Sequence, residues 1–401
     1  MKISKRMEGL EESATLAVTA KAKEMKAKGM DVVGFGAGEP DFDTPDNIKK
    51  AAIAAIDKGK TKYTAVGGIE ELKDAVIAKF KRDNNLSYSR EEALISCGGK
   101  HSIFNLFQAF LDEGDEVVIP SPYWVSYPAM VRLSGGTPRI VDTDERTGFK
   151  MTAEAFSGSI TKKTKAVVIN SPSNPTGCVY SPDELKAIAG VALKNNVFII
   201  SDEIYEKLTY GETPFISIAS ISEEVKKNTV VLNGVSKTYS MTGWRIGYAA
   251  GPKELIKAMT IIQGQSTSNP ASISQWAALE AMNGPQDTVT KMREVFKKRR
   301  GTMVEGLNAI KGVKCLLPGG AFYAFANVSG VYGKSFKGKK INTSMDVTTY
   351  LLEEALVAVV PGEAFGNDNF IRLSYACSER DIETGLKRMK EALEKLEGDC
   401  P

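Results

Sequence analysis

The sequence contains very little histidine. Among its 401 residues there is one, His101. A single imidazole excludes every metal site that needs two histidines, and a Ser-His or Cys-His mechanism would have to use this one residue. No second histidine or cysteine stands beside His101, so we interpret it as a structural residue. If the chain is an enzyme, another group must carry out most of the proton transfer.

Cysteine is also scarce and follows no disulfide or metal-binding pattern. The five cysteines are widely scattered without a C-x-x-C pair, at Cys97, Cys178, Cys315, Cys377 and Cys400. An odd number at such spacing argues against a disulfide framework and a zinc ribbon and is typical of a reducing cytosol. We therefore predict a cytoplasmic protein without a bound metal.

Long apolar segments and an excess of charge are both missing. No stretch approaches the roughly 20 apolar residues of a membrane span, and the first residues lack the apolar core of a signal peptide. The 52 Lys and Arg residues nearly balance the 49 Asp and Glu residues. A net charge of +3 gives no electrostatic reason to expect nucleic acid or an anionic membrane as a partner.

Between about residues 90 and 250, short apolar runs alternate with helical patterns. The runs are mostly rich in Val and Ile with little polar alternation, as in strands that are buried on both faces. They lie at 93–97, 116–120, 165–170, 197–201, 229–233 and 246–250. Helical patterns lie at 102–111, 182–195 and 271–282. This alternation predicts an α/β fold with a mainly parallel sheet and with ligand groups at the carboxyl ends of its strands.

The pattern changes after Asn283-Gly284-Pro285. A highly charged helical stretch is expected at 286–310, running along the surface between two domains. It is followed by strand patterns and a last amphipathic helix, at 313–317, 321–327, 356–360, 370–375 and 379–396. This part of the chain has the character of an α+β unit. The first 40 or so residues, with a helix near 14–28 and a strand at 31–35, are too few to fold alone and are expected to pack on it.

Lys237 follows the strand pattern 229–233 and stands among small, turn-forming residues. Most lysines are solvated surface residues, but a partly buried lysine loses its charge readily and can form a Schiff base. Arg245, eight positions later, remains a cation that suits a phosphate. Taken alone, the pair is compatible with either a surface segment or a reactive lysine.

Three other side chains follow predicted strands. Asp202 is either a helix cap or a buried carboxylate that faces a cationic ring nitrogen, with Tyr205 three residues later. Spacing alone does not decide between these alternatives. Trp124 is either a core residue or an aromatic platform for a flat cofactor.

Two further strand ends and one strand interior carry polar groups. The Gly98-Gly99 pair is either a plain strand-to-helix turn or an anion site made by backbone N–H groups at a helix N-terminus. The loop 170–177 is rich in turn formers and contains Asn174. Arg372 lies within an apolar strand pattern and needs an anion as partner. Together these groups meet at one sheet edge and fit a phosphorylated aromatic cofactor that a Schiff base holds.

Several sequence blocks carry a resemblance to a known family. They are Ser236–Tyr248 with Ser-Lys followed by Met-Thr-Gly-Trp-Arg-Ile-Gly-Tyr, Asn-Pro-Thr-Gly at 174–177, Ser-Asp-Glu-Ile-Tyr at 201–205, and Gly-Glu-Pro-Asp-Phe at 38–42. The sequence resembles the class I aminotransferases, which are pyridoxal-phosphate enzymes of fold type I, and within them the bacterial aspartate aminotransferases. The resemblance covers nearly the whole chain.

The resemblance implies a division into two domains and an obligate homodimer. The large cofactor-binding domain is expected at 46–284, with a seven-stranded, mainly parallel sheet flanked by helices. Residues 1–45 and 285–401 are expected to form the smaller α+β domain. Tyr63 is expected to reach the phosphate of the neighbouring subunit, so that the active sites are shared. The bonds before Pro122 and Pro175 are expected to be cis.

The resemblance also assigns the catalytic and cofactor-binding residues. Lys237 would form the Schiff base and then move the proton between the substrate Cα and the cofactor. Asp202 would pair with the pyridinium nitrogen, while Asn174 and Tyr205 would hydrogen-bond the phenolic oxygen. Trp124 would stack on the ring. The phosphate would be held by the backbone of Gly99 and Lys100, together with Ser236 and Arg245.

For the substrate, the resemblance assigns the α-carboxylate to Arg372, with the backbone around Gly38 closing over it. Lys100 would contact a distal carboxylate, helped by Thr15. Trp124 and Asn174 would also touch the substrate. This set favours aspartate and 2-oxoglutarate as the substrate pair.

Other functions remain as alternatives. Prephenate, aromatic and alanine aminotransferases share the scaffold, although Glu11-Glu12 stands near the place where prephenate-active relatives carry a lysine. A pyridoxal-phosphate lyase or synthase is a second class. A non-enzymatic regulator with the same fold is remote, because it would need an added DNA-binding domain.

Overall fold

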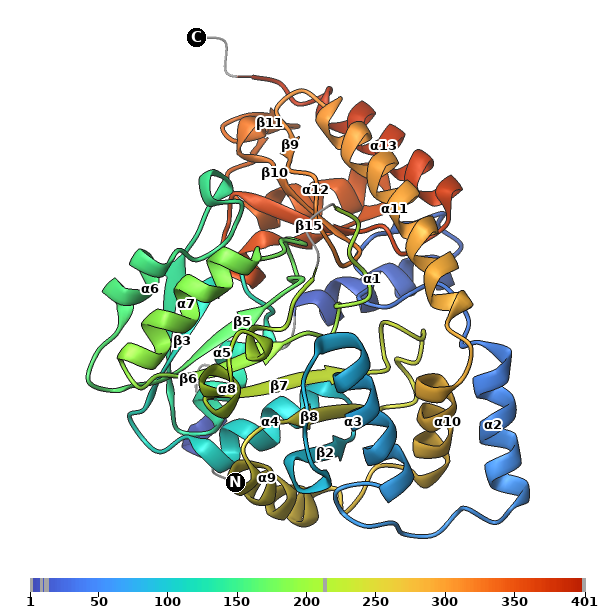
Figure 1. Cartoon of the computed structure of the whole chain (residues 1–401). Coiled ribbons are helices and arrows are strands. Elements are labelled where there is room, and N and C mark those ends of the chain that lie inside the picture. The colour runs from blue at the N-terminus through green and yellow to red at the C-terminus, as the bar shows by residue number, and fades with distance from the viewer. Residues whose placement is uncertain (1–2, 8–9, 11–13, 212–214, 399–401) are drawn as a thin grey trace.

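The computed structural model describes residues 3–7, 10, 14–211 and 215–398. Two sheets organise this part of the chain, and helices cover them (Figure 1). The helices are α1 (Ala14–Ala27), α2 (Asp46–Asp57), α3 (Glu70–Asn84), α4 (Gly99–Phe110), α5 (Ser126–Leu133), α6 (Ala153–Ser159), α7 (Pro182–Lys194), α8 (Glu223–Lys227), α9 (Lys253–Ser266), α10 (Ser272–Asn283), α11 (Asp287–Asn308), α12 (Ser344–Ala355) and α13 (Glu379–Leu393). Within these residues, no helix is both long and apolar enough to cross a membrane.

The larger sheet has seven strands in the order β2-β8-β7-β6-β5-β3-β4. Their bounds are β2 (Ala93–Ser96), β3 (Glu116–Ser121), β4 (Thr137–Asp142), β5 (Thr164–Asn170), β6 (Phe198–Asp202), β7 (Thr229–Gly234) and β8 (Gly247–Ala250). The pairs from β7 through β6, β5 and β3 to β4 are parallel, whereas β8 runs antiparallel to β7 and β2. The prediction of a mainly parallel sheet is therefore confirmed.

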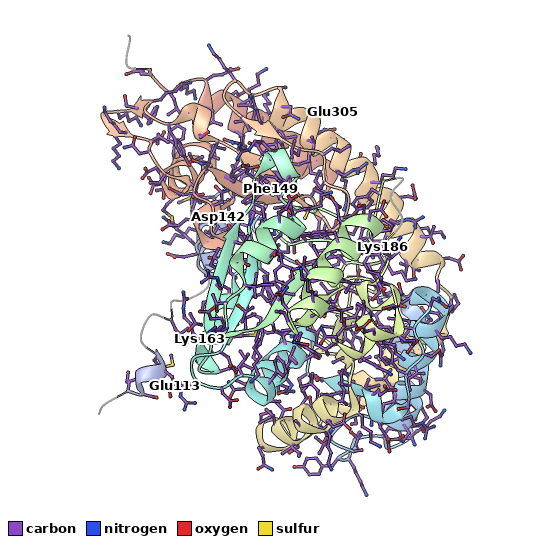
Figure 2. All side chains as sticks on the ribbon, turned by 60° about the vertical axis from the view of Figure 1, so that its left-hand side comes forward. Glu113, Asp142, Phe149, Lys163, Lys186 and Glu305 are labelled. Carbon is purple, nitrogen blue, oxygen red and sulfur yellow. The ribbon has the colours of Figure 1, made fainter. Side chains whose placement is uncertain are left out.

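The Val- and Ile-rich strands are apolar along their whole length because both faces of the sheet are covered. Alternate residues of β5 show this, since Val168 packs with α4, α5 and α9 while Val167 packs with α6 and α7. Strand β7 divides in the same way, with Leu232 on the first face and Val231 packed with α3 and α10 on the second. Charged side chains such as Lys186 of α7 extend outward from this layer (Figure 2).

A four-stranded antiparallel sheet forms the second layer, in the order β14-β15-β10-β9. Its strands are β9 (Lys314–Cys315), β10 (Tyr323–Asn327), β14 (Val360–Pro361) and β15 (Phe370–Ser374), and two short pairs join β1 (Val33–Gly34) to β13 (Val357–Ala358) and β11 (Ser335–Phe336) to β12 (Lys339–Lys340). Helices α11, α12 and α13 pack with this sheet in one apolar core. Helix α11 leads along the surface from the region of α10 to this layer (Figure 1).

Candidate active site

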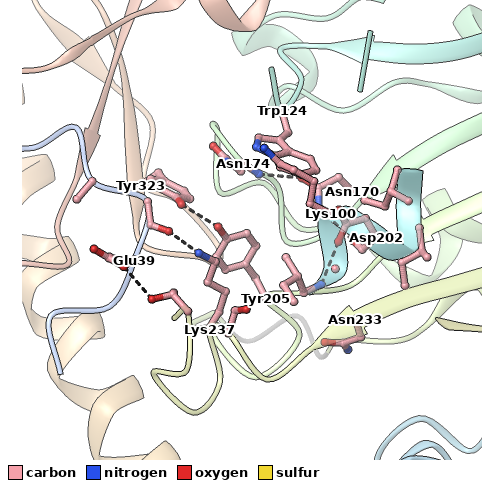
Figure 3. A pocket seen from close by; sticks show the side chains of 18 of the residues that line it. Glu39, Lys100, Trp124, Asn170, Asn174, Asp202, Tyr205, Asn233, Lys237 and Tyr323 are labelled. Carbon is pink, nitrogen blue, oxygen red and sulfur yellow. Dashed lines mark hydrogen bonds between the residues drawn. The ribbon is translucent and has the colours of Figure 1, made fainter. Parts of the chain in front are cut away.

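A cavity of about 500 Å³ lies where strand ends of the large sheet face residues of the second sheet (Figure 3). The ends of β5, β6 and β7 contribute Asn170, Asp202 and Asn233 to its wall, and β10 and β15 contribute Tyr323 and Arg372. All the predicted site residues line this cavity except Tyr63 and Thr15. The side chain of Thr15 is outside the described part of the structure.

Lys237 projects into the cavity from the loop that follows β7 (Figure 3). Its Nζ donates a hydrogen bond to the carbonyl oxygen of Gly38. Burial lowers the pKa of this amine to about 8, and the nearby cations Arg372 and Arg245 add to the decrease while Glu39 opposes it. The amine therefore becomes neutral, and hence nucleophilic, close to physiological pH.

Asp202 is the last residue of β6, and its carboxylate is buried at the cavity wall. Oδ2 accepts a hydrogen bond of 2.6 Å from the hydroxyl of Tyr127. Oδ1 accepts one of 3.2 Å from the backbone N–H of Ile204. Burial raises the pKa of this carboxyl, and the two hydrogen bonds oppose the increase. A cation placed beside Asp202 would stabilise the ionised form further.

Tyr205, like Trp124, lines the cavity (Figure 3). Its hydroxyl exchanges a hydrogen bond of 2.8 Å with the hydroxyl of Tyr323. Burial raises the pKa of Tyr205 well above its ordinary value, so its proton is retained. The side chain is therefore a hydrogen-bond donor to any oxygen anion in the cavity.

Arg372 is a buried cation in β15 without a carboxylate partner among the described residues. Nη1 donates to Oδ1 of Asn174 at 3.0 Å, and Nη2 donates to the carbonyl oxygen of Gly36 at 2.9 Å. Its Nε has no partner in the described structure. The guanidinium also lies over the Tyr323 ring, 4.5 Å from its centroid. A guanidinium that is 2% exposed requires an anion, and the cavity is where that anion can bind.

The start of α4 forms a cradle of backbone N–H groups at the cavity. Gly98 precedes the helix at φ 89°, a left-handed conformation that favours glycine. A Cβ on Gly247 of β8 would lie 2.2 Å from the nitrogen of Gly99, so the close approach of these two segments requires glycine. The first N–H groups of a helix lack partners within the helix. They therefore face the cavity as donors for an anion.

Three predicted phosphate ligands surround this cradle. Ser236, Lys100 and Arg245 all line the cavity. Arg245 donates from Nη1 to the carbonyl oxygen of Thr242 at 2.9 Å. The ammonium of Lys100 lies 5.0 Å from the ring centroid of Trp124, and burial together with Arg245 lowers the pKa of this lysine. A bound anion would relieve the mutual repulsion of these cations.

Sequence reasoning missed several residues of the cavity wall, namely Lys23, Glu39, Tyr127, Asn233, Thr242 and Tyr323. Glu39 accepts a hydrogen bond of 2.8 Å from the hydroxyl of Thr242. Asn233 is the penultimate residue of β7, and its buried Nδ2 has no partner in the described structure. The position of Asn233 after an apolar strand was a usable signal, as it was for Asp202. Tyr127 and Tyr323 gave no such signal, because each lies at the start of a helix or strand and not after one.

Tyr63 and His101 lie outside the cavity-lining set. Tyr63 is 90% exposed, in the segment between α2 and α3. In His101, Nδ1 accepts the backbone N–H of Cys97 at 3.4 Å and Nε2 lies 3.2 Å from the hydroxyl of Ser266. The bonds before Pro122 and Pro175 are cis, as expected, and so is the bond before Pro172.

Comparisons with known proteins cover nearly the whole chain. A family model described as aminotransferase class I and II matches residues 30–389. The aspartate aminotransferase of Geobacillus stearothermophilus is 52% identical over 394 residues, which are 98% of this chain and 99% of that protein. A probable aspartate/prephenate aminotransferase of Rhizobium leguminosarum bv. phaseoli is 53% identical over 380 residues, 94% of this chain and 95% of that protein. The crystal structure of the aspartate aminotransferase from Rhizobium meliloti matches with a TM-score of 0.96 and 46% identity, covering 99% of this chain and all of that one.

Proposed function

The chain belongs to the class I and II aminotransferase family, and from this membership we propose that it transfers the amino group of aspartate to 2-oxoglutarate. Enzymes of this family use pyridoxal 5′-phosphate. The observation that carries the proposal is that one cavity holds both Lys237, whose pKa is about 8, and the buried Arg372. The first supplies an amine that is easily deprotonated, and the second supplies a site for a carboxylate.

The residues of the cavity fit pyridoxal phosphate. The glycine cradle at α4, with Ser236 and Arg245, has the donors that a phosphate requires. The unpartnered Nδ2 of Asn233 offers a further buried donor. Trp124 would cover one face of the ring, and Asp202 would hold the proton of the ring nitrogen. When bound, this cofactor supplies a carbonyl that condenses with amines and a ring that accepts electrons released at the substrate Cα.

The remaining chemistry falls to the chain's own side chains. Neutral Lys237 would take the proton from the substrate Cα and deliver it to the carbonyl-derived carbon of the cofactor. Arg372 would hold the substrate α-carboxylate with Asn174, fixing the Cα–H bond near this amine. Tyr205 would donate a hydrogen bond to the phenolic oxygen. The segment around Gly38 and Glu39, next to Lys237, would exclude water from the reacting atoms.

Specificity for a second carboxylate would come from Lys100, with help from Thr15. Lys100 lies at the cavity beside Trp124, and no acidic residue pairs with it among the described residues. A cation without a counter-ion favours a dicarboxylic substrate over an apolar one. The Rhizobium leguminosarum relative is described as a probable aspartate/prephenate aminotransferase, so prephenate is the second candidate substrate.

Further proposals concern the assembly and location of the protein. Two copies would form a homodimer in which Tyr63 of each reaches the phosphate of the other. The exposure of Tyr63 on one copy supports this arrangement. The large domain would span 46–284, with 1–45 and 285–401 forming the small one. Cys97, Cys178, Cys315 and Cys377 are free thiols, which supports a reducing cytoplasmic location.

A Lys100→Met variant tests the proposed specificity. The purified protein and the variant would be assayed with 2-oxoglutarate and one amino donor at a time, at equal concentrations. The donors are aspartate, alanine, phenylalanine and the amino acid that transamination of prephenate forms. We expect aspartate to be preferred by the wild type, and the variant to lose about 10- to 100-fold in kcat/KM for aspartate while keeping its cofactor. Preference for an aromatic donor or prephenate in the wild type would overturn the aspartate assignment, and net ammonia release would indicate a lyase.

A further inference from the structure

The segment after β6 carries buried carboxylates that the proposed chemistry does not use. Asp202 and Tyr205 line the cavity, whereas Glu203 and Glu206 do not. Glu203 is 1% exposed and Glu206 is 6% exposed. The sheet pairing of β6 ends at Asp202, and the chain at 204–207 forms turns, so side-chain contacts contribute to holding the segment after the strand. The groups that hold Glu203 and Glu206 therefore influence where Asp202 and Tyr205 lie.

Glu206 belongs to a closed triangle of buried polar side chains. Its Oε1 forms a salt bridge with Lys79 of α3, a lysine that is 2% exposed. Lys79 also donates to Oδ1 of Asn84 at 2.7 Å. The amide of Asn84, at the end of α3, then donates to Oε2 of Glu206 at 2.8 Å. All three side chains are thus satisfied by one another, in a geometry that admits little movement.

Two more contacts fix the same segment. Lys207, the next residue, pairs with Asp83 of α3 at 2.9 Å. Glu203 accepts hydrogen bonds on one oxygen from Ser201 at 2.8 Å and Ser217 at 2.6 Å. Helix α3 therefore holds the end of the turn, while the serines hold its beginning.

A buried ion pair is seldom more stable than an apolar pair of similar volume, so stability alone does not explain this triangle. We propose that Lys79, Asn84 and Glu206 are positioning residues that hold the 202–205 segment so that Asp202 and Tyr205 meet the cofactor at the correct place. The inference rests on the proposed function. Because the triangle acts from behind the cavity, its effect would appear at the cofactor without any contact to it.

Glu203 and Glu206 have different partners, since Glu203 bonds to two serine hydroxyls and Glu206 to Lys79 and Asn84. Burial, together with the nearby charge of Glu206, raises the pKa of Glu203 to about 8. Glu203 is therefore mainly protonated at neutral pH, while Glu206 is paired with a cation. A Glu203→Gln variant keeps the shape and the two accepted hydrogen bonds, so it is a matched control for Glu206→Gln.

The test compares Glu206→Gln, Asn84→Ala and the double variant Lys79→Met/Glu206→Leu with two controls. The controls are Glu203→Gln and Lys298→Met, the latter in an exposed pair with Glu379. The readouts are the melting temperature of the apoprotein, the Kd for pyridoxal phosphate, the pH at which the visible band of the bound cofactor shifts, and kcat/KM. We expect the double variant, in which the buried Asn84 loses both partners, to melt below the wild-type temperature but to fold, to shift the pH midpoint and to lose about 10- to 100-fold in kcat/KM.

Asn84→Ala keeps the ion pair and is the variant most certain to fold. It should move the pH midpoint and kcat/KM in the same direction by a smaller factor, while both controls stay at wild-type values. The proposal is overturned if the folded double variant keeps the wild-type midpoint and kcat/KM. If the double variant does not fold, the same result for Asn84→Ala overturns it. Absence of transamination by the wild type would instead count against the proposed function. In that case the Kd for pyridoxal phosphate would still measure whether the triangle positions the cofactor-binding residues.

Discussion

Lys237 and Arg372 line the same cavity, but only the lysine loses its charge easily there. Arg372 is buried, and its charge contributes to lowering the pKa of Lys237. Burial makes the lysine easy to deprotonate, whereas arginine keeps its charge in any protein environment. Lys237 therefore supplies an amine that can react, and Arg372 supplies a permanent cation that can bind a carboxylate.

The pKa of Lys237 predicts how the apoprotein captures its cofactor. Below about pH 8 this amine is protonated and cannot attack a carbonyl, and above about pH 8 it is neutral. The rate of covalent capture of pyridoxal phosphate, trapped with borohydride, should therefore rise with pH and level off above a midpoint of about 8. A midpoint at the ordinary lysine value of 10.5 would contradict the effect of burial.

Arg372→Lys keeps the charge but removes the planar fork. Because one ammonium cannot serve the carboxylate, Asn174 and the Gly36 carbonyl at once, kcat/KM for aspartate should fall by about 10- to 100-fold. Steady-state kinetics on both the amino acid and the oxo acid would measure this loss. The exposed Arg146→Lys is the control and should change neither value. An equal response of the two variants would argue that Arg372 does not bind substrate.

Sequence reasoning selected Asp202 and Lys237 because each lies at or shortly after the end of an apolar strand, and the structure places both at the cavity. It could not find Tyr127 or Tyr323, which reach the cavity from the starts of α5 and β10. Their hydroxyls contact Asp202 and Tyr205 only after distant segments pack together. Such partners depend on tertiary structure, so spacing along the chain does not reveal them.

Among the elements, the turn from β2 into α4 depends on its contact with β8. Gly98, Gly99 and Gly247 permit this contact, since a Cβ on Gly247 would lie 2.3 Å from the carbonyl carbon of Gly98. The N-terminus of α4 is thereby held at the cavity, where its N–H groups can bind a phosphate.

A Gly247→Ala variant tests this element. The added methyl group should push the start of α4 away from β8, costing about 1–3 kcal/mol of unfolding free energy. The Kd for pyridoxal phosphate should rise at least about tenfold, as measured by absorbance titration, because the phosphate donors move. Gly243→Ala is the matched control, since nothing lies within 4 Å of its added Cβ. An unchanged Kd in a folded Gly247→Ala protein would show that this cradle does not hold the phosphate.

The buried central strands were predicted closely, because burial on both faces makes them continuously apolar. The predicted strand 229–233, for instance, corresponds to β7 at Thr229–Gly234. Strand β4 was missed, since Thr137–Asp142 is a partly exposed edge strand that contains Pro138 and Arg139. The predicted strand 356–360 is interrupted and divides into β13 and β14, which join different partners.

At the scale of the whole molecule, the cavity draws residues from both sheets, from the first 40 residues and from the loop after β7. Segments that are far apart in sequence therefore meet at one site. The composition of the chain predicts neither this meeting nor the place of the cavity, although the sequence blocks shared with the aminotransferase family indicated the participating segments.

The proposed homodimer with shared active sites predicts that two inactive variants complement each other. A Lys237→Ala subunit lacks the amine of its own site, and a Tyr63→Ala subunit impairs the site of its partner. Refolding equal amounts together should restore about a quarter of the wild-type activity, since half of the random dimers would be mixed and each would hold one intact site. Activity equal to the average of the two parent variants would contradict a shared site.

The most direct test of the central claim is a visible absorption spectrum of the purified protein before and after addition of L-aspartate. The account predicts a yellow band from pyridoxal phosphate bound at Lys237, which aspartate converts to the pyridoxamine form and which 2-oxoglutarate restores. A band that does not respond to aspartate would contradict the proposed substrate. The absence of any band after incubation with pyridoxal phosphate would contradict the role of Lys237 itself.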